Sequence, residues 1–534
     1  MIPVASASQS DKKAFILLTP RFRWRINAAI VALALANWCF VRTWSHLLLN
    51  GYRFYDDQPL TLADLFALTA NILGFAVLFW FGIALWRRSR TGIPALVLEL
   101  LFFSLLIIPI DFLRAEIFGQ TDAEVIARIK NPLAMTLVVA ALLFLLWQHR
   151  RVARVAAAVL AITSPVALWT LFKIILAGCN LTLIKTCSIC ALPPPLLPVN
   201  GDHPRVVWMI FDETDYRMAF AKRPPGLTLP EFDRLRDVSL SADHACAPAD
   251  QTLVSMSSLI VGRRLAAVSR DGCDMALQME DDRTTHDLSS LPSVFSQARE
   301  LGVNTALVGW HVPYGRLLGG SLNYCSWYAM ASHQMAGAAP WFDLLEHQIA
   351  AMAWPLRNRQ IFINICQGSL KDALSVAGDP VYGLLLFHLP PPHAPGVYLP
   401  EKKKFTFMGI HRPKAYFNNL ALADFELGEL RRKMETSGQW DKSWIIVSAD
   451  HSWRTSQCYD GVRDYRVPFL VKPPGAETSS VTYTTPFNTV LTHDFILAIL
   501  NRQITNQSNA KAWLDAHIVP GQPVMPSKAV FEIE

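Results

Sequence analysis

The stretch Val206-Val-Trp-Met-Ile-Phe-Asp-Glu-Thr-Asp215 sets six apolar residues directly before a cluster of acids. A short, continuous apolar run predicts a strand that is buried on both faces of a sheet. Three further runs have the same character: 304–309, 382–388 and 443–448. Helical patterns lie between the runs, notably at 291–301 and 416–436. Strands that alternate with helices predict an α/β domain whose mostly parallel sheet is covered by helices on both faces.

Side chains that could bind a metal or take part in catalysis follow three of these predicted strands. Open α/β sheets place their sites at this end of the strands. These side chains are Asp212 and Glu213 after the first strand, His388 and His393 after the third, and Asp450 and His451 after the fourth. Carboxylates and neutral imidazoles together suit Zn²⁺ or Mn²⁺. We expect His388 to be a structural strand-end residue, and Asp424 to be a core-facing or capping residue of the 416–436 helix.

The first 180 residues carry nearly all of the long apolar runs. Five runs approach or exceed the roughly 20 residues that a helix needs to cross a bilayer. They are 25–49, 62–86, 93–115, 132–148 and 153–177. The predicted parts of the chain are a cytoplasmic N-terminal segment (1–24), a five-helix transmembrane domain (25–177), a Pro-rich linker (178–203) and a catalytic domain (204–534).

Basic residues concentrate in alternate loops between these runs. They are Lys12, Lys13, Arg21, Arg23 and Arg25 before the first run, Arg87, Arg88 and Arg90 after the second, and Arg150, Arg151 and Arg154 after the fourth. Because positively charged loops stay in the cytoplasm, the N-terminus is predicted to be cytoplasmic and the chain after residue 178 to lie outside. Asp111 and Arg114 share a helix face and are expected to pair, either as an ion pair near the outer interface or as substrate contacts.

The net charge of +6 contains no block of like charges, and no zinc-finger spacing or RNP-type motif occurs. These features argue against a nucleic-acid partner. Eight of the nine cysteines follow the last long apolar run: Cys179, Cys187, Cys190, Cys246, Cys273, Cys325, Cys366 and Cys458. An even number in an oxidising compartment predicts a disulfide framework, and a set of buried free thiols is the alternative.

Five segments of the second half share the motifs of one enzyme family, in chain order. They are Phe211-Asp-Glu-Thr214, Thr252-Leu-Val-Ser-Met-Ser-Ser-Leu-Ile-Val-Gly262, Gly309-Trp-His311, Pro392-His-Ala-Pro395 and Ser448-Ala-Asp-His451. Over 204–475 the chain resembles the sulfatase-like branch of the alkaline phosphatase superfamily. With its five apolar runs it is similar to bacterial phosphoethanolamine transferases and to lipoteichoic acid synthase-type phosphoglycerol transferases.

The resemblance implies a role for each matching residue. Metal ligands would be Glu213, Thr252, Asp450 and His451, with Asp212 as a further candidate. Thr252 would be the nucleophile, ten residues before Gly262, and His393 and His311 would move protons or hold phosphoryl oxygens. Zn²⁺ is the implied metal, with Mn²⁺ as a second possibility.

The implied reaction is the transfer of phosphoethanolamine or phosphoglycerol from a phospholipid donor through a phospho-threonine intermediate. The acceptor would be an envelope lipid or glycan, as in lipopolysaccharide modification, and the location would be the inner (plasma) membrane. The alternative is a membrane-anchored sulfatase-like hydrolase, either a phosphodiesterase or a sulfatase. Nothing in the sequence indicates the oligomeric state.

Several departures from the family pattern keep the alternatives open. Cys246-Ala-Pro-Ala-Asp250 nearly matches the sulfatase signature Cys-x-Pro-x-Arg, but it ends in aspartate and lies six residues too far from Gly262. Ser452 stands where glycine usually follows the histidine, and His493, in a helix-like run, is an uncertain counterpart of a late site histidine. Thr252 has the alternative role of a helix N-cap.

Overall fold

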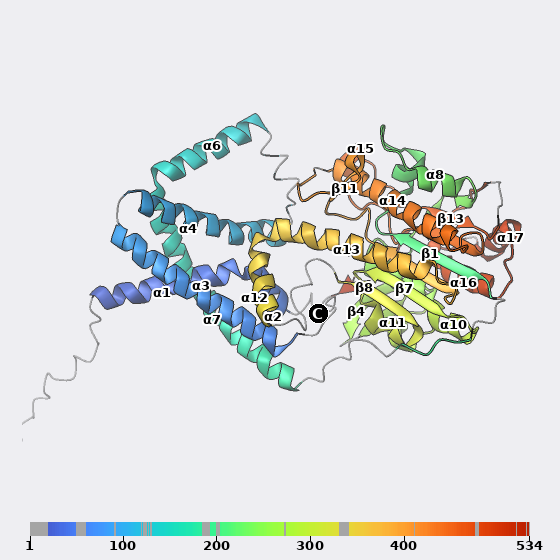
Figure 1. Ribbon diagram of the computed structural model, residues 1–534, viewed down its shortest axis with the longest axis horizontal. Helices are drawn as coiled ribbons and strands as arrows, with labels where there is room; N and C mark the ends of the chain where they lie inside the picture. The colour runs from blue at the N-terminus through green and yellow to red at the C-terminus, as the bar shows by residue number, and fades with distance from the viewer. Residues whose placement is uncertain are drawn as a thin grey trace, which may run out of the picture. The chain divides into compact units, whose positions relative to one another are not determined.

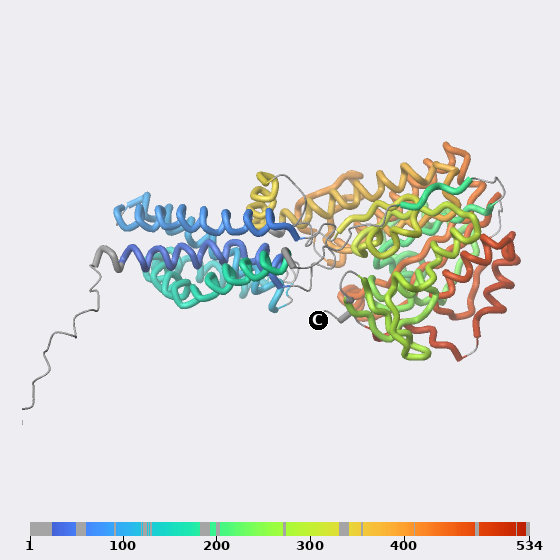
Figure 2. The backbone as a smooth tube through the Cα atoms, turned by 90° about the horizontal axis from the view of Figure 1, so that it is seen from below, coloured from blue at the N-terminus to red at the C-terminus, as the bar shows by residue number. Residues whose placement is uncertain are grey.

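The computed structural model describes most of the chain in side-chain detail. The described residues are 20–49, 60–89, 92–118, 120, 125, 128, 131–183, 193–198, 203–271, 274–329, 341–410, 412–475, 480–519, 521–529 and 531–532. The chain forms two compact units, which are drawn in Figures 1 and 2. Unit 1 contains Met1–Leu48, Leu62–Leu183 and Ala339–Ala353, and unit 2 contains Leu49–Thr61, Ile184–Ala338 and Trp354–Glu534. The domain boundaries given above stay a prediction.

An eight-stranded sheet in the order β14-β2-β13-β12-β1-β9-β7-β8 organises unit 2. Its strands are β1 (Arg205–Phe211), β2 (Leu240–Ala242), β7 (Thr305–Trp310), β8 (Tyr324–Tyr328), β9 (Leu384–Leu389), β12 (Ser443–Ser448), β13 (Phe469–Lys472) and β14 (Val481–Tyr483). The neighbours β12-β1-β9-β7-β8 run parallel, whereas β13 is antiparallel to β12 and to β2. The predicted mostly parallel sheet is therefore confirmed, and each of the four predicted strands lies within two residues of its position.

Helices cover both faces of this sheet (Figure 1). Because side chains alternate along a strand, successive residues of β1 from Val206 to Phe211 enter two different core clusters. One cluster takes side chains from α9 (Thr252–Val261), α10 (Val294–Glu300), α11 (Tyr314–Leu318), α16 (Thr492–Leu500) and α17 (Gln507–His517). The other takes side chains from α8 (Pro230–Arg236), α13 (Trp354–Ala377) and α14 (Lys414–Thr436). All seven side chains of β1 are buried, as its apolar sequence predicts.

Smaller elements complete unit 2. A four-stranded sheet, in the order β16-β4-β5-β6, consists of β4 (Leu265–Asp271), β5 (Asp274–Met279), β6 (Thr285–Asp287) and β16 (Phe531–Glu532). Two short strand pairs join β10 (Tyr398–Leu399) to β11 (Lys404–Phe405) and β3 (Ala245–Cys246) to β15 (Phe487–Asn488). The short helix α15 (Gln457–Asp460) lies between β12 and β13 in the chain. Asp424 on α14 accepts the backbone N–H groups of Glu231 and Phe232, so it caps the start of α8.

Unit 1 is helical. It contains α1 (Pro20–Cys39), α2 (Val41–Leu48), α3 (Leu62–Ser89), α4 (Ile93–Phe112) with the π-helical turn η2 (Leu113–Ile117), α6 (Pro132–Trp147), α7 (His149–Leu183) and α12 (Trp341–Ala350). All five predicted apolar runs are helical, and the first is broken into α1 and α2, which meet at a bend of 68°. Helix α12 was not among the predicted members of this unit.

Three helices of the described chain are long and apolar enough to cross a membrane: Leu62–Ser89, Ile93–Ile117 and His149–Leu181. The bent pair α1 and α2 adds a fourth crossing if it forms one span. Helix α6 has 16 residues, fewer than the roughly 20 that a bilayer requires. The composition therefore indicates a membrane protein, and the five predicted spans are not confirmed as a set.

The predicted pair of Asp111 and Arg114 is present in unit 1, with 2.6 Å between Arg114 Nη2 and Asp111 Oδ1. The buried guanidinium of Arg42, on α2, donates to Asp111 at 2.8 Å and to Glu116 at 2.9 Å. Every carboxylate of this cluster therefore faces an arginine, and the cluster links α2 to α4 and η2.

The predicted disulfide framework is not supported. Cys246, Cys366 and Cys458 are free thiols, and the first two are buried. Burial raises the pKa of the Cys246 thiol to about 11. Cys187, Cys190 and Cys273, which also belong to the predicted framework, lie outside the described residues.

Candidate metal centre

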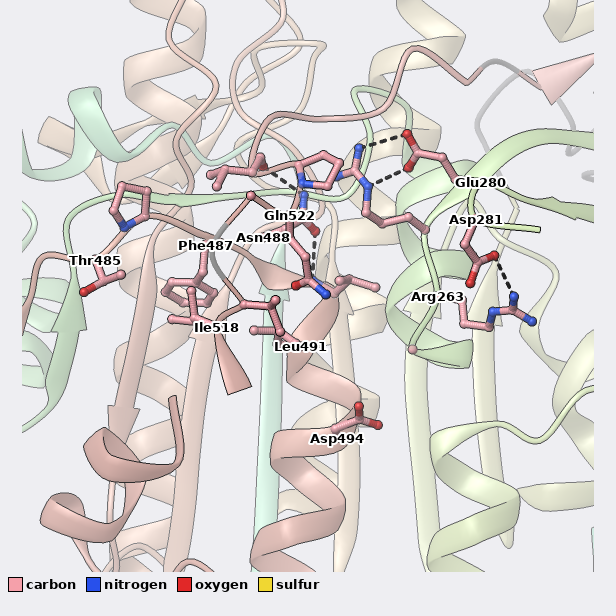
Figure 3. A pocket seen from close by; sticks show the side chains of 18 residues that line it. Arg263, Glu280, Asp281, Thr485, Phe487, Asn488, Leu491, Asp494, Ile518 and Gln522 are labelled. Carbon is pink, nitrogen blue, oxygen red and sulfur yellow. Dashed lines mark hydrogen bonds and ion pairs between the residues drawn. The ribbon is translucent and has the colours of Figure 1, made fainter. Parts of the chain in front are cut away.

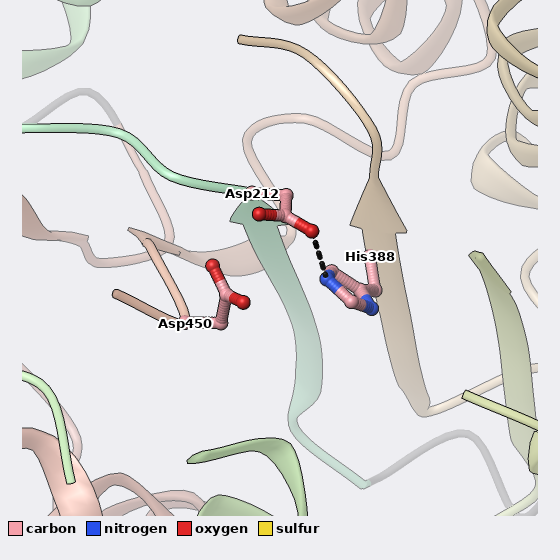
Figure 4. Close-up of side chains that lie close together, drawn as sticks. All are labelled: Asp212, His388 and Asp450. Carbon is pink, nitrogen blue, oxygen red and sulfur yellow. Dashed lines mark ion pairs between the residues drawn. The ribbon is translucent and has the colours of Figure 1, made fainter. Parts of the chain in front are cut away.

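The carboxyl ends of three neighbouring parallel strands bring one group of donors together. In the sheet register, Ile210 of β1 lies between Ser448 of β12 and His388 of β9. Asp212 follows β1, and Asp450 follows β12 two residues after Ser448. Asp212, His388 and Asp450 therefore share one edge of the sheet, as Figure 4 shows. This is the edge at which parallel α/β sheets carry their sites.

These three residues offer ligand atoms that all lie within 4.8 Å of one another. All three are completely buried. Among the described residues, both carboxylate oxygens of Asp212, Oδ2 of Asp450 and Nε2 of His388 find no hydrogen-bond partner. Buried polar atoms are normally satisfied, because leaving one unsatisfied costs about 1–3 kcal/mol. Four unsatisfied acceptor atoms in one small space fit a cation, so these residues could hold a metal ion.

His388 is the donor that sequence reasoning missed, since it was expected to be structural. Its Nε2 lies 3.7 Å from Asp212 Oδ2, and its Nδ1 is hydrogen-bonded to the Tyr314 hydroxyl at 2.8 Å. A hydrogen bond to the ring nitrogen that does not face the metal fixes the orientation of a metal-binding imidazole. Gly309 makes the contact possible, because a Cβ there would lie 2.5 Å from the Tyr314 ring. The signal available in the sequence was the position of His388 at the end of a buried strand.

Asp450 is held by the backbone around it. Its Oδ1 accepts the N–H of Glu213 at 3.0 Å and the N–H of His451 at 2.9 Å. Its Oδ2 is therefore the atom that Asp450 can offer to a metal together with Asp212 and His388. Glu213 has a φ of 68°, in the left-handed region that side chains other than glycine rarely adopt. This strained backbone turns the N–H of Glu213 toward the carboxylate of Asp450, and such strain is concentrated at functional sites.

Thr252 and His451 meet beside the donor group. Thr252 Oγ1 lies 3.2 Å from His451 Nε2, which is 3.8 Å from Asp212 Oδ1 and 3.4 Å from Asp450 Oδ2. Burial opposes the charged imidazolium, but the carboxylates of Asp450 and Asp212 outweigh it and raise the pKa of His451. Gln251 is the N-cap of α9 and Thr252 is its first helical residue, so the alternative role of Thr252 as the N-cap is wrong.

Glu213 lies beside this group rather than in it. Its Oε1 accepts the backbone N–H of Arg454 at 3.1 Å and lies 3.5 Å from Arg454 Nε. Burial opposes ionisation, but the charges of His393, His451 and Arg454 outweigh it and lower the pKa of Glu213. Of the predicted ligands, Asp212 and Asp450 therefore belong to the compact group, whereas Glu213, Thr252 and His451 surround it.

Both predicted proton-handling histidines line the same region. The ring of His393 packs edge-on against Trp310, with 5.0 Å between centroids, and its Nε2 lies 3.4 Å from Arg454 Nη2. His311 follows β7 directly, with a φ of 67°. Burial and the neighbouring histidines lower the pKa of His311 to about 3, so its imidazole is neutral at physiological pH.

The opposite end of α9 lies away from this centre. Gly262 ends the helix in the left-handed conformation, ten residues or about 15 Å along the axis from Thr252. His493 packs against Gly262, so it contacts the wrong end of the helix to serve the site. A hollow of about 850 Å³ lies at this end, lined by Arg263, Glu280, Asn488 and Gln522 among others (Figure 3).

No protein-family model and no curated protein matches the chain. Among solved structures, the chain is similar to Ps i-CgsB in complex with k-i-k-neocarrahexaose, with a TM-score of 0.42 and 15% identity over 58% of this chain and 74% of that chain. It is also similar to the sulfatase PsFucS1 from Pseudoalteromonas sp., with a TM-score of 0.41 and 15% identity over 56% and 68%. A protein in the alkaline phosphatase superfamily from Vibrio parahaemolyticus follows, with a TM-score of 0.38 and 13% identity over 57% and 68%.

Proposed function

We propose that this protein is a membrane-bound, metal-dependent enzyme of the alkaline phosphatase and sulfatase type that transfers a phospholipid head group. The observation that carries the proposal is the set of potential metal-ligand atoms on Asp212, His388 and Asp450 that accept no hydrogen bond from the described residues. The Thr252 hydroxyl lies beside this set. Carboxylate and imidazole ligands suit Zn²⁺, with Mn²⁺ as the second candidate. When bound, such a metal favours the alkoxide form of a hydroxyl nucleophile and offsets negative charge on phosphoryl oxygens.

Thr252 is placed to act as the nucleophile. His451 Nδ1 lies 3.0 Å from the carbonyl oxygen of Ser452. Because a carbonyl oxygen only accepts, Nδ1 carries a proton, and in the neutral form of the imidazole Nε2 accepts a hydrogen bond from Thr252. In the proposed first step the Thr252 hydroxyl gives its proton to His451 Nε2 and its oxygen forms a bond to phosphorus, while the bond from phosphorus to the diacylglycerol oxygen breaks and His393 gives a proton to that oxygen. In the second step an acceptor hydroxyl gives its proton to His393 and displaces the Thr252 oxygen, which takes its proton back from His451.

The Arg454 guanidinium is placed to bind the phosphoryl group that is transferred. It lies between the carboxylate of Glu213 and the ring of His393, and its side chain is 41% exposed. An arginine in this position offers fixed donors to phosphoryl oxygens, where a transfer reaction concentrates negative charge. His311 stays neutral and contributes through its position at the end of β7 rather than as an acid.

Transfer to an envelope lipid or glycan is the reaction that we favour over hydrolysis. The apolar helices of unit 1 exceed what a simple anchor requires, which suits a donor that lies in the membrane. The alternating basic loops favour a cytoplasmic N-terminus and a catalytic unit outside the inner membrane. The sulfatase alternative would use Cys246 converted to formylglycine, but Cys246-Ala-Pro-Ala-Asp250 carries aspartate where the sulfatase signature has arginine.

The test is to incubate the full-length protein in bilayer nanodiscs with phosphatidylethanolamine or phosphatidylglycerol that carries a labelled head group. We expect label on the peptide that contains Thr252, no label after treatment with a chelator, and recovery with Zn²⁺ or Mn²⁺. Thr252→Ala is expected to lose the label. Ser258→Ala is the matched control, because it removes from the same helix a buried hydroxyl that has no hydrogen-bond partner among the described residues.

Two results would overturn this function. One is full turnover by Thr252→Ala, and the other is a modified Cys246. Release of the free head group without any labelled acceptor lipid or glycan would instead establish the hydrolase alternative.

A further inference from the structure

Helix α12 (Trp341–Ala350) belongs to the helical unit although its sequence neighbours belong to the catalytic unit. It lies in the chain between β8 and α13, both elements of unit 2, yet it packs on α3 within unit 1. The two views agree on this contact between α12 and α3 (Figures 1 and 2). The chain therefore leaves the catalytic unit, adds one helix to the membrane unit and returns.

A buried polar clamp holds α12 in place. The side chain of Gln348 is fully buried, donates to the backbone carbonyl of Asp64 at 3.1 Å and accepts from Asn71 Nδ2 at 3.0 Å. Asn71 also lies within 3.4 Å of the Leu345 carbonyl oxygen. These contacts satisfy the buried amides of both helices, so they fix the depth at which α12 sits along α3.

The clamp lies near one end of a membrane-spanning helix. Helix α3 begins at Leu62, and Asn71 is nine residues later, about 14 Å along the axis at 1.5 Å per residue. The other end of α3 carries Arg87 and Arg88, which the positive-inside rule assigns to the cytoplasmic side. With that topology, helix α12 lies at the depth of the outer leaflet.

The residues of α12 divide into three sides at helical spacing of about 100° per residue. Leu344 and Gln348 are buried and face α3. Asp343, Glu346 and His347 form a polar side. Trp341, Phe342, Leu345 and Ile349 form an apolar side between them, which we call the apolar flank. Phe342 is 76% exposed, Trp341 45% and Ile349 40%.

We propose that α12 is an interfacial membrane helix whose apolar flank contacts the acyl chains of the outer leaflet. The partner follows from continuity, because α3 beside it is a membrane span and the flank lies at the same depth as the lipid-facing side chains of that span. Trp341 and Phe342 pack edge to face, with 5.6 Å between ring centroids, and together present a rigid aromatic surface. Aromatic residues are enriched at this level of the bilayer. Through this helix the chain between β8 and α13 is anchored in the leaflet from which the proposed lipid donor would come.

The experiment places a photoreactive benzophenone side chain at single positions of the full-length protein in nanodiscs of phosphatidylethanolamine and phosphatidylglycerol. Phe342→p-benzoylphenylalanine and Ile349→p-benzoylphenylalanine test the apolar flank. Glu346→p-benzoylphenylalanine is the matched control on the polar side of the same helix. Phe81→p-benzoylphenylalanine on α3 is the positive control, since Phe81 is 59% exposed in a membrane span. Intact mass after illumination reports adducts of one phospholipid.

We expect lipid adducts at positions 342, 349 and 81, and several-fold fewer at position 346. Adducts at 81 without adducts at 342 and 349, or equal adducts at 342 and 346, would overturn the proposal. Crosslinks from position 342 to protein alone would overturn it as well. The readout does not involve catalysis, so it stands apart from the proposed transferase function.

Discussion

Two clusters of charged side chains, one in each unit, differ in how their charges are balanced. In unit 1, Arg42 and Arg114 face Asp111 and Glu116, and each carboxylate meets a guanidinium within 3 Å. In unit 2, Asp212 and Asp450 hold carboxylate oxygens that accept no hydrogen bond from the described part of the chain. The charges of the first cluster balance one another and join helices, whereas the second cluster holds buried ligand atoms in excess of the partners around them and is a candidate site.

The largest expected effect is the loss of activity and metal on Asp212→Asn. The change removes one of the three proposed metal ligands, so we expect metal content to fall below one ion per ten chains. Activity should fall by more than the roughly 10–100-fold that follows when only a hydrogen-bond partner of a ligand is lost. The melting temperature of the metal-free protein should hold or rise, because a buried charge without a partner disappears. A metal-free protein that unfolds at a lower temperature than its parent would show that Asp212 is structurally paired.

Unlike Asp212→Asn, Asp111→Asn in unit 1 should lower the stability of the protein. It leaves the buried Arg42 short of one carboxylate, so we expect the protein to lose about 2 kcal/mol of stability, less than the 3–5 kcal/mol of a fully buried pair because Asp111 is partly exposed. Metal content should not change. Glu116→Gln is the control, since that carboxylate is 43% exposed and its loss should cost less. Thermal unfolding in detergent measures all three proteins, and unchanged stability in Asp111→Asn would remove the contrast between the clusters.

Tyr314→Phe should weaken the metal site without removing a ligand. The change deletes the hydroxyl on His388 Nδ1 and keeps the ring that packs against Gly309. We expect metal affinity to fall by roughly 10–100-fold, as is usual for a partner of a ligating histidine. Competition with a metal-binding dye measures the affinity. An unchanged affinity would mean that His388 is not a ligand.

The smallest expected effect on activity comes from Asp424, a residue of α14 outside both clusters, where the change is in the pH dependence of stability. Burial raises the pKa of Asp424 from 3.8 to about 7. Because the folded state then holds a proton that the unfolded state has released, stability should fall as the pH rises from about 4 to about 7, by up to about 1.4 kcal/mol per pH unit. Asp424→Asn keeps an oxygen for the N–H groups of Glu231 and Phe232 and should flatten this slope. If the stability of the parent and that of Asp424→Asn change with pH by the same amount, Asp424 stays ionised in the folded protein.

The sequence by itself determined the elements and their chemistry. The apolar runs before Asp212 and before Asp450 predicted two central strands, because burial on both faces requires continuous apolar sequence. Those runs also predicted where acids would meet, because parallel strands end at one edge. The long apolar helices of the first half were equally visible, since the bilayer sets their length.

Only the tertiary structure decided which neighbours complete the site. His388 joined the donor group because β9 lies beside β1 with His388 level with Ile210, and no local pattern states that register. Glu213 turned toward Arg454, a contact across 241 residues that spacing does not reveal. The sequence of α12 likewise shows an amphipathic helix, but only its packing on α3 assigns it to the membrane unit. Local physics selects strands and helices, whereas the partners of a side chain depend on contacts between segments that are distant in the chain.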